Sequence, residues 1–226
     1  MNTLDMMLLM GDEVVEPVEP QEWYLTSDIL ESNVIGVWQP KGAIDLATSY
    51  NSLVGSKVLT TTSAPTWNST DGWIFDGLTQ YLSMDITPTV DTTVIIRYTI
   101  SLLGQKSFFG GASADWVMFA IYLAEPEYTG QMGSSQSVVE EAPPLNGVIA
   151  LNANGIYLNG TLKGIYDQPV TFTNTVNPLW IGGVYSPYSL YSTEEYAVEM
   201  IQAISLYNNK LSATQIASIS AKMTLL

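Results

Sequence analysis

The sequence predicts an all-β protein: an antiparallel jelly-roll β-sandwich with a short C-terminal helix and an extended N-terminal arm. Three observations favour this fold. From residue 33 onward, short runs rich in β-branched and aromatic residues alternate with Gly, Pro, Asn, Asp and Ser. An Asn-Gly pair between two such runs indicates a β-hairpin. Near the C-terminus, apolar residues recur instead at helical spacing.

Residues 1–32 differ from the rest of the chain, because they hold eight acidic residues and no basic one. The stretch Gly11–Trp23 (GDEVVEPVEPQEW) repeats Glu-Pro, which favours a polyproline-like arm over a helix. Such an arm could place an apolar, Met-rich tip in a groove of a partner, and a disordered tail is the alternative. We therefore expect an assembly arm at 1–32 and one jelly-roll domain at 33–226. The tip consists of Met6, Met7, Leu8, Leu9 and Met10.

Eleven runs in the domain have the composition of strands and are separated by turn residues. They are Val34–Gln39, Gly72–Gly77, Gln80–Met84, Thr92–Leu102, Lys106–Gly111, Asp115–Leu123, Gly147–Asn152, Gly155–Asn159, Thr161–Tyr166, Leu179–Tyr185 and Val198–Asn208. The four tryptophans within these runs are expected in the core. They are Trp38, Trp73, Trp116 and Trp180. The segment Ala124–Gly147 is predicted as a long acidic loop, part of which could form another strand.

Two helices are predicted, a weak one at Ala43–Leu53 and a well-specified one near the C-terminus. Ser212 and Gln215 have the spacing of a capping box, with Leu211 and Ile216 at the two positions of a hydrophobic staple. The helix should lay one apolar stripe on the sandwich. That stripe is Ile216, Ile219 and Met223.

The hairpin is predicted around Asn159-Gly160, since both central residues of a type I′ turn need positive φ and this pair tolerates it. In that register Leu158 faces Thr161, Tyr157 faces Leu162 and Ile156 faces Lys163. The hairpin is therefore expected to be structural.

Composition excludes several functions. Seven basic residues against twenty-two acidic ones give a formal net charge of −15, which disfavours nucleic acid and anionic membrane surfaces as partners. The chain has no His and no Cys, so it cannot form a Ser-His-Asp triad, a Cys-His pair or a zinc site of imidazole or thiolate ligands. The apolar run Met6–Met10 is too short for a signal sequence or a membrane span, and neither is predicted.

The loop VYSPYSLYSTEEY (Val184–Tyr196) is the best candidate ligand surface in the sequence. Tyrosine rings at a loop tip can stack on a sugar or contact a protein, and neighbouring carboxylates can accept hydrogen bonds from hydroxyl groups. Both ligand classes, and simple loop packing, remain open. The candidate residues are Tyr185, Tyr188, Tyr191, Glu194 and Glu195.

Several segments in this order resemble laminin-G-like domains of the concanavalin A-like lectin and glucanase superfamily. GVIALNANGIYLNGTLKG, NPLWIGGVY and VEMIQAISLYNNKLSATQIASI resemble the closing half of such a domain. WQPKGAIDLATSYNSL and APTWNSTDGWIFDGLTQYLSMDITP resemble the opening half, as it occurs in virion proteins of tailed bacteriophages. The resemblance covers residues 33–223 and implies a jelly roll that hosts lectins, glycan hydrolases, adhesion modules and structural subunits.

The catalytic and metal-binding patterns of that superfamily are not found in the sequence. Its glucanases carry an E-x-D-x-x-E arrangement, and the nearest approaches, Glu195–Met200 and Glu125–Glu127, lack that spacing. The aspartates Asp76, Asp85, Asp91, Asp115 and Asp167 fall singly at turns, so they are interpreted as turn residues and not as calcium ligands. We therefore predict no enzymatic activity, no metal and no cofactor.

The sequence-based hypothesis is a non-enzymatic virion surface protein of a bacteriophage: a capsid decoration, head-fibre or tail-associated subunit. It would be made in the host cytoplasm, attach to other virion proteins through residues 1–32 and display the sandwich on the virion surface. A lectin module that binds host surface glycans is the alternative, and a divergent glycoside hydrolase is a more remote one. No pattern in the sequence predicts the oligomeric state.

Overall fold

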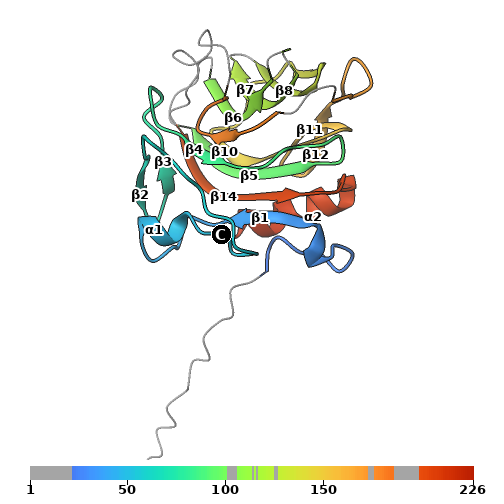
Figure 1. Cartoon of the computed structure of the whole chain (residues 1–226). Helices are drawn as coiled ribbons and strands as arrows, with labels where there is room; N and C mark the ends of the chain where they lie inside the picture. Colours follow the sequence, from blue (N-terminus) through green and yellow to red (C-terminus); the bar gives the residue numbers. More distant parts are fainter. Residues whose placement is uncertain are drawn as a thin grey trace, which may run out of the picture.

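The protein folds into two antiparallel sheets packed face to face, with one long helix on the outside of the larger sheet (Figure 1). This architecture confirms the predicted β-sandwich with its C-terminal helix. It is seen in a computed structural model that describes residues 22–100, 106–113, 115, 117–124, 127–172, 176–185 and 199–226.

The larger sheet has eight strands in the order β12-β11-β10-β5-β14-β3-β2, with β1 also paired to β14. β14 and β5 lie at its centre and pair over nearly their whole lengths, from Glu199↔Ile100 to Tyr207↔Thr93. The bounds are β1 Val34–Trp38, β2 Thr66–Asn68, β3 Gly72–Ile74, β5 Thr93–Ile100, β10 Asn146–Asn152, β11 Gly155–Leu158, β12 Thr161–Gly164 and β14 Glu199–Tyr207.

The smaller sheet has six strands in the order β4-β13-β6-β7-β8-β9. β6 to β9 follow one another as a meander, and β13 and β4 complete the other edge. Its bounds are β4 Leu82–Met84, β6 Lys106–Ala112, β7 Met118–Ala124, β8 Glu127–Gly133, β9 Ser135–Val139 and β13 Leu179–Ile181.

The main core lies between the sheets and consists of the inward side chains of alternating strand positions. On β5 the inward residues are Val94, Ile96, Tyr98 and Ile100, all fully or almost fully buried. Trp38 and Trp73 are fully buried in the same cluster, as predicted.

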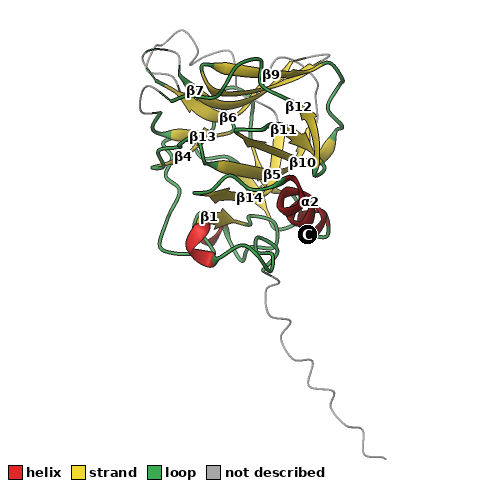
Figure 2. Cartoon of the chain, turned by 90° about the vertical axis from the view of Figure 1, so that its right-hand side faces the viewer, coloured by secondary structure: helices red, strands yellow, loops and turns green. Residues whose placement is uncertain are grey.

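The C-terminal helix α2 (Ala213–Thr224) covers the outer face of the larger sheet (Figure 2). The predicted capping box is confirmed: the Gln215 backbone N–H donates to the Ser212 hydroxyl, and the Ser212 N–H donates to the Gln215 side chain. The predicted stripe is buried completely and packs on Ile95, Val148, Ala150 and Ala203. This second core fixes the helix to the sheet.

The Asn-Gly hairpin joins β11 to β12 with positive φ at both central residues, 49° at Asn159 and 79° at Gly160. Leu158 faces Thr161 and Tyr157 faces Leu162, as predicted, but an irregularity then pairs Ile156 with Gly164 instead of Lys163. The turn is structural, because the Asn159 side chain accepts a hydrogen bond from the Val148 N–H at 2.9 Å.

Residues 22–32, which the sequence assigns to the arm, pack on the outside of the larger sheet beside α2. Trp23 is 1% exposed and donates through Nε1 to the Gln39 side chain, and Ile29 is 5% exposed. Lys222 donates to the Leu25 carbonyl. These apolar side chains therefore complete the second core, and the division of the chain at residue 32 stays a prediction. Residues 1–21 lie outside the described part of the chain.

Strands β2 and β9 lie where the sequence predicted none, and β8 is the further strand that part of Ala124–Gly147 was expected to be able to form. The last two form a hairpin within the segment predicted as a long loop, and β9 alternates buried and exposed residues from Ser135 to Val139. The other helix, α1 (Leu46–Ser49), is a single turn capped by Asp45, whose carboxylate accepts from the Thr48 N–H at 2.7 Å.

Candidate functional site

Of the five candidate residues in the predicted ligand loop, the structure describes Tyr185. It lies four residues after the end of β13 and bridges to β6: the Ala112 N–H donates to its carbonyl at 2.7 Å, and its own N–H donates to the Gly110 carbonyl at 3.1 Å. These two bonds fix the start of the loop against the smaller sheet. The other candidates, Tyr188, Tyr191, Glu194 and Glu195, lie outside the described residues, as do Met6, Met7, Leu8, Leu9 and Met10 of the predicted arm.

Tyr185 belongs to a cluster of three aromatic rings on the outer face of the smaller sheet. Tyr81 and Trp180 stack with ring centroids 3.9 Å apart and planes 15° from parallel. The Tyr185 ring meets Trp180 edge-on, with centroids 5.4 Å apart. All three side chains are half-buried, so each ring is held by its neighbours while part of its surface faces water. We call these three residues the aromatic cluster.

The alternation of β13 explains why Trp180 faces outward. Leu179 and Ile181 are fully buried in the main core, so the side chain between them points to the other face of the sheet. The cross-strand partner of Trp180 on β6 is Gly110, which has no side chain to compete for the same space. The prediction that Trp180 is a core residue is therefore wrong. Trp116, the remaining tryptophan of that prediction, lies outside the described residues.

Tyr81 is anchored at its polar end, because its hydroxyl lies 2.8 Å from the Thr62 hydroxyl. A ring fixed by stacking on one face and by a hydrogen bond at its tip loses little entropy when a ligand stacks on it. The aromatic cluster is therefore preorganised. Sequence analysis missed Tyr81, although it follows a turn directly and alternates with the buried Leu82.

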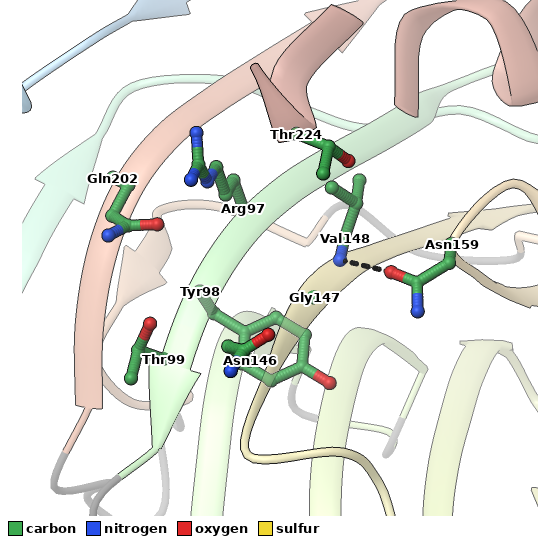
Figure 3. A pocket seen from close by; sticks show the side chains of 9 residues that line it. All are labelled: Arg97, Tyr98, Thr99, Asn146, Gly147, Val148, Asn159, Gln202 and Thr224. Atoms are coloured by element: carbon green, nitrogen blue, oxygen red, sulfur yellow. Dashed lines mark hydrogen bonds between the residues drawn. The ribbon is translucent and has the colours of Figure 1, made fainter. Parts of the chain in front are cut away.

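A second site is a hollow of about 390 Å³ on the outer face of the larger sheet, where α2 ends (Figure 3). Polar side chains from β5, β10, β14 and the end of the helix surround it. No acidic residue is among its lining residues, in a chain with twenty-two acidic residues. Sequence analysis did not predict this hollow. The lining includes Arg97, Thr99, Asn146 and Gln202.

Glu199 is the one buried carboxyl group among the described residues, and it was not singled out from the sequence. It is 1% exposed, and neither oxygen has a hydrogen-bond partner. Burial raises its pKa well above the usual value near 4.5. Burial is the only cause of that shift, so among the described residues no second carboxylate lies beside Glu199 with which it could form a catalytic pair.

In the described ranges, no three side chains among Asp, Glu, His and Cys come together as a set of metal ligands. None of the helices in that part of the chain is long and apolar enough to cross a membrane.

Comparison with known sequences gives no assignment: no protein-family model matches this chain, and no curated protein matches it significantly.

The solved structures with a similar fold include two kinds of protein. One is Trypanosoma rangeli sialidase, for example in complex with sialic acid, with a TM-score of 0.62, 13% identity and coverage of 86% of this chain but 33% of the sialidase chain. The other is botulinum neurotoxin. The type C structure, described for its interaction with two ganglioside molecules, has a TM-score of 0.58, 10% identity and coverage of 85% of this chain and 52% of that one. At this identity the similarity shows a common fold, and the chain spans only a third to a half of these proteins.

These structures correct the prediction that the chain is not an enzyme. Chains that contain this fold include sialidases, so the fold and the missing glucanase pattern do not justify excluding enzymatic activity. The match covers about a third of each sialidase, and a shared fold by itself establishes no activity.

Proposed function

We propose that this chain is a glycan-binding β-sandwich module and that the aromatic cluster is its binding surface. The observation that supports this most is the set of three half-buried rings, Tyr81, Trp180 and Tyr185, fixed against one another on the outer face of the smaller sheet. Aromatic faces bind the apolar face of a sugar ring, and they do so best when they are already held in place. The loop that begins at Tyr185 supplies further tyrosines and two glutamates in sequence.

Similar folds support the same class of ligand. The sialidase structure contains sialic acid, the type C toxin structure concerns gangliosides, and a related toxin binding domain is seen with a sialylated ligand at a TM-score of 0.53 and 11% identity. These are properties of those proteins. They make a glycan the first ligand class to test on this chain.

We also propose that the module is of the laminin-G-like kind and is displayed on a bacteriophage virion. This rests on the resemblance of residues 33–223 to such domains and on the acidic, base-free N-terminal segment with its Glu-Pro repeat, which would attach the module to other virion proteins. The two proposals are compatible, since a surface subunit that binds host glycans would serve attachment.

A glycan array tests the binding function. It should include bacterial surface polysaccharides, sialyllactose and neutral oligosaccharides. The unaltered protein should bind at least one glycan, and Trp180→Leu should lower that binding at least tenfold, because leucine keeps the apolar contact with the strand but removes the stacking face.

The matched control is Trp67→Leu, which removes another half-buried tryptophan, on β2 of the other sheet, and should leave binding unchanged. Thermal unfolding of both variants separates a binding defect from a folding defect. Equal binding by unaltered and Trp180→Leu protein would contradict the aromatic cluster as the site.

A further inference from the structure

The outer face of the larger sheet changes from apolar to polar at the end of α2. On β5 the outward residues are Ile95, which the helix covers, and then Arg97 and Thr99, which are only half-buried. The helix ends at Thr224, so the sheet beyond it is not covered and the hollow forms there (Figure 3). A packed sheet face that turns polar beside a hollow is a candidate binding surface.

Arg97 is the only arginine in the chain. One of its terminal nitrogens, Nη1, donates to the Met223 carbonyl at the C-terminal end of α2, at 2.7 Å. That bond fixes the guanidinium and favours the helix end, but it uses one of five N–H donors. In the described ranges the guanidinium has no carboxylate partner, and the one ion pair found there joins Lys163 to Glu141.

Arg97 keeps its positive charge at this half-buried position. Burial lowers its pKa, but a guanidinium stays protonated at any physiological pH. A second cation, Lys41, lies nearby: burial lowers the pKa of its ammonium group most, the charge of Arg97 lowers it further, and Asp71 raises it. Arg97 therefore presents a cation to the hollow in a protein with a net charge of −15. An unpaired cation at such a place favours an anionic ligand.

The hollow also contains neutral groups suited to hydroxyl groups. Gln202 is the extra residue of a β-bulge on β14, where Ile201 pairs with Tyr98 and Ala203 with Arg97. Bulges redirect a side chain, and this one places Gln202 in the lining beside Arg97. Thr99 and Asn146 face each other across β5 and β10 and line the same hollow. At about 390 Å³ it is larger than a bare carboxylate needs and falls at the lower end of small-molecule sites.

We propose that this hollow binds an acidic sugar residue, with its carboxylate paired to Arg97 and its hydroxyl groups bonded to Gln202, Thr99 and Asn146. The planar guanidinium suits a carboxylate because two parallel N–H donors match two oxygens. The site lies on the opposite sheet from the aromatic cluster and does not depend on it.

Nuclear magnetic resonance tests the proposal directly, since a single arginine gives a single Nε–Hε signal. The full chain is titrated with D-glucuronate, D-galacturonate and N-acetylneuraminate, and with D-glucose, D-galactose and acetate as matched probes. At least one acidic sugar should shift the Arg97 signal to saturation, while the neutral sugars and acetate at the same concentrations should not. No shift with any acidic sugar, or an equal shift with acetate, would overturn the assignment.

Asn146→Asp supplies the second test. Asn146 is exposed at the rim and not part of the helix contact, so the change adds a negative charge to the hollow without removing the Arg97 bond to Met223. Affinity for the acidic sugar should fall at least tenfold. Asn154→Asp, the same change at an exposed position beyond the other end of β10, should leave it unchanged. Unaltered affinity in Asn146→Asp would count against the site whether or not the aromatic cluster binds glycans.

Discussion

Glu199 places a carboxyl group in the otherwise apolar space between the sheets. It lies two residues before Ile201 on β14 and pairs with Ile100 of β5, so it shares the inward face of both strands. The N–H of Phe75 donates to its backbone carbonyl, but its side chain has no partner among the described residues. A buried carboxyl group without a partner favours its neutral form, which is why its pKa is raised.

This predicts a particular dependence of stability on pH. A carboxyl group whose pKa is higher in the folded than in the unfolded state holds its proton longer in the folded state. The contribution of Glu199 to stability should therefore be most favourable below about pH 4.5, where the group is protonated in both states, and should become less favourable as pH rises toward the folded pKa. Glu199→Gln keeps the shape without the charge and should raise the free energy of unfolding at pH 8 by at least about 1 kcal/mol.

Urea unfolding between pH 4 and pH 9 measures the effect. Glu140→Gln is the matched control, because Glu140 is exposed. The difference between Glu199→Gln and the unaltered protein should grow with pH, and the difference for Glu140→Gln should stay near zero. The prediction fails if the difference in free energy of unfolding between Glu199→Gln and the unaltered protein is the same at pH 8 as at pH 4. In that case the Glu199 carboxyl group is hydrated or paired in solution.

Sequence analysis could identify a residue correctly only where a local sequence pattern fixed the environment of that residue. Ser212 and Gln215 were predicted because a capping box involves only residues three apart. Trp180 was misassigned, since its exposure follows from which sheet β13 joins and from Gly110 opposite it, and both are non-local. Arg97 was missed for the same reason: the hollow forms only because α2 ends above it.

The hairpin turn between β11 and β12 is held under the C-terminal helix. A Cβ added to Gly160 would lie 2.7 Å from the Ala217 Cα, closer than side-chain atoms approach a backbone. Gly160 therefore has two constraints, a positive φ of 79° and contact with α2. Gly55 has a similar φ of 70°, but a Cβ there would meet nothing within 4 Å.

Alanine substitutions at Gly55 and Gly160 separate the cost of a positive φ from the cost of the contact with α2. Gly55→Ala should lower stability by about 1 kcal/mol, the cost of a left-handed backbone for a residue with a side chain. Gly160→Ala should cost about 1 to 3 kcal/mol more, because the helix must also shift or the turn must open. Denaturant unfolding measures both losses. Equal losses would mean that the turn does not press on the helix.

Among the elements, those with strong local signals were predicted and those with weak ones were not. The hairpin and α2 were predicted from a turn pair and a capping box. β9 was assigned to a loop and β8 was predicted only as a strand that part of the loop could form, because their Gly, Ser and Gln residues have low strand propensity. β8 becomes a strand by pairing with β7, and β9 by pairing with β8. Sheet context thus decided their structure.

The whole molecule has two apolar cores, and the N-terminal segment belongs to the second. Residues Trp23, Tyr24 and Ile29 pack in the same cluster as the apolar stripe of α2. The Tyr207 hydroxyl donates to the Tyr24 carbonyl at 2.8 Å, and Gln215 donates to the Asp28 carboxylate at 2.9 Å. The segment therefore connects β14 and α2, although its acidic composition in sequence indicated an independent arm.

Two truncations should behave differently. Removal of residues 1–21 takes away none of these contacts, so the melting temperature should stay within about 2 °C of the full chain. Removal of residues 1–32 exposes the apolar surface under Trp23 and Ile29, and burial of each such side chain contributes about 1.5 to 3 kcal/mol. The longer truncation should therefore lose at least about 3 kcal/mol and unfold at a clearly lower temperature. Calorimetry of both truncations gives the comparison.

A point variant keeps this prediction testable if the longer truncation does not fold. Trp23→Ala should cost about 3 to 5 kcal/mol of stability through the cavity it leaves and the loss of the hydrogen bond to Gln39. The control Glu22→Ala, at an exposed neighbouring position, should cost less than about 0.5 kcal/mol.

The shorter truncation tests the proposed attachment role by itself, because it removes the Met-rich tip and the Glu-Pro repeat without touching the second core. If the protein attaches to virions through this segment, the 1–21 truncation should fail to assemble into particles although it is fully folded. Full assembly of that truncation would contradict the arm, and an unchanged melting temperature in Trp23→Ala would contradict the packing of residues 22–32.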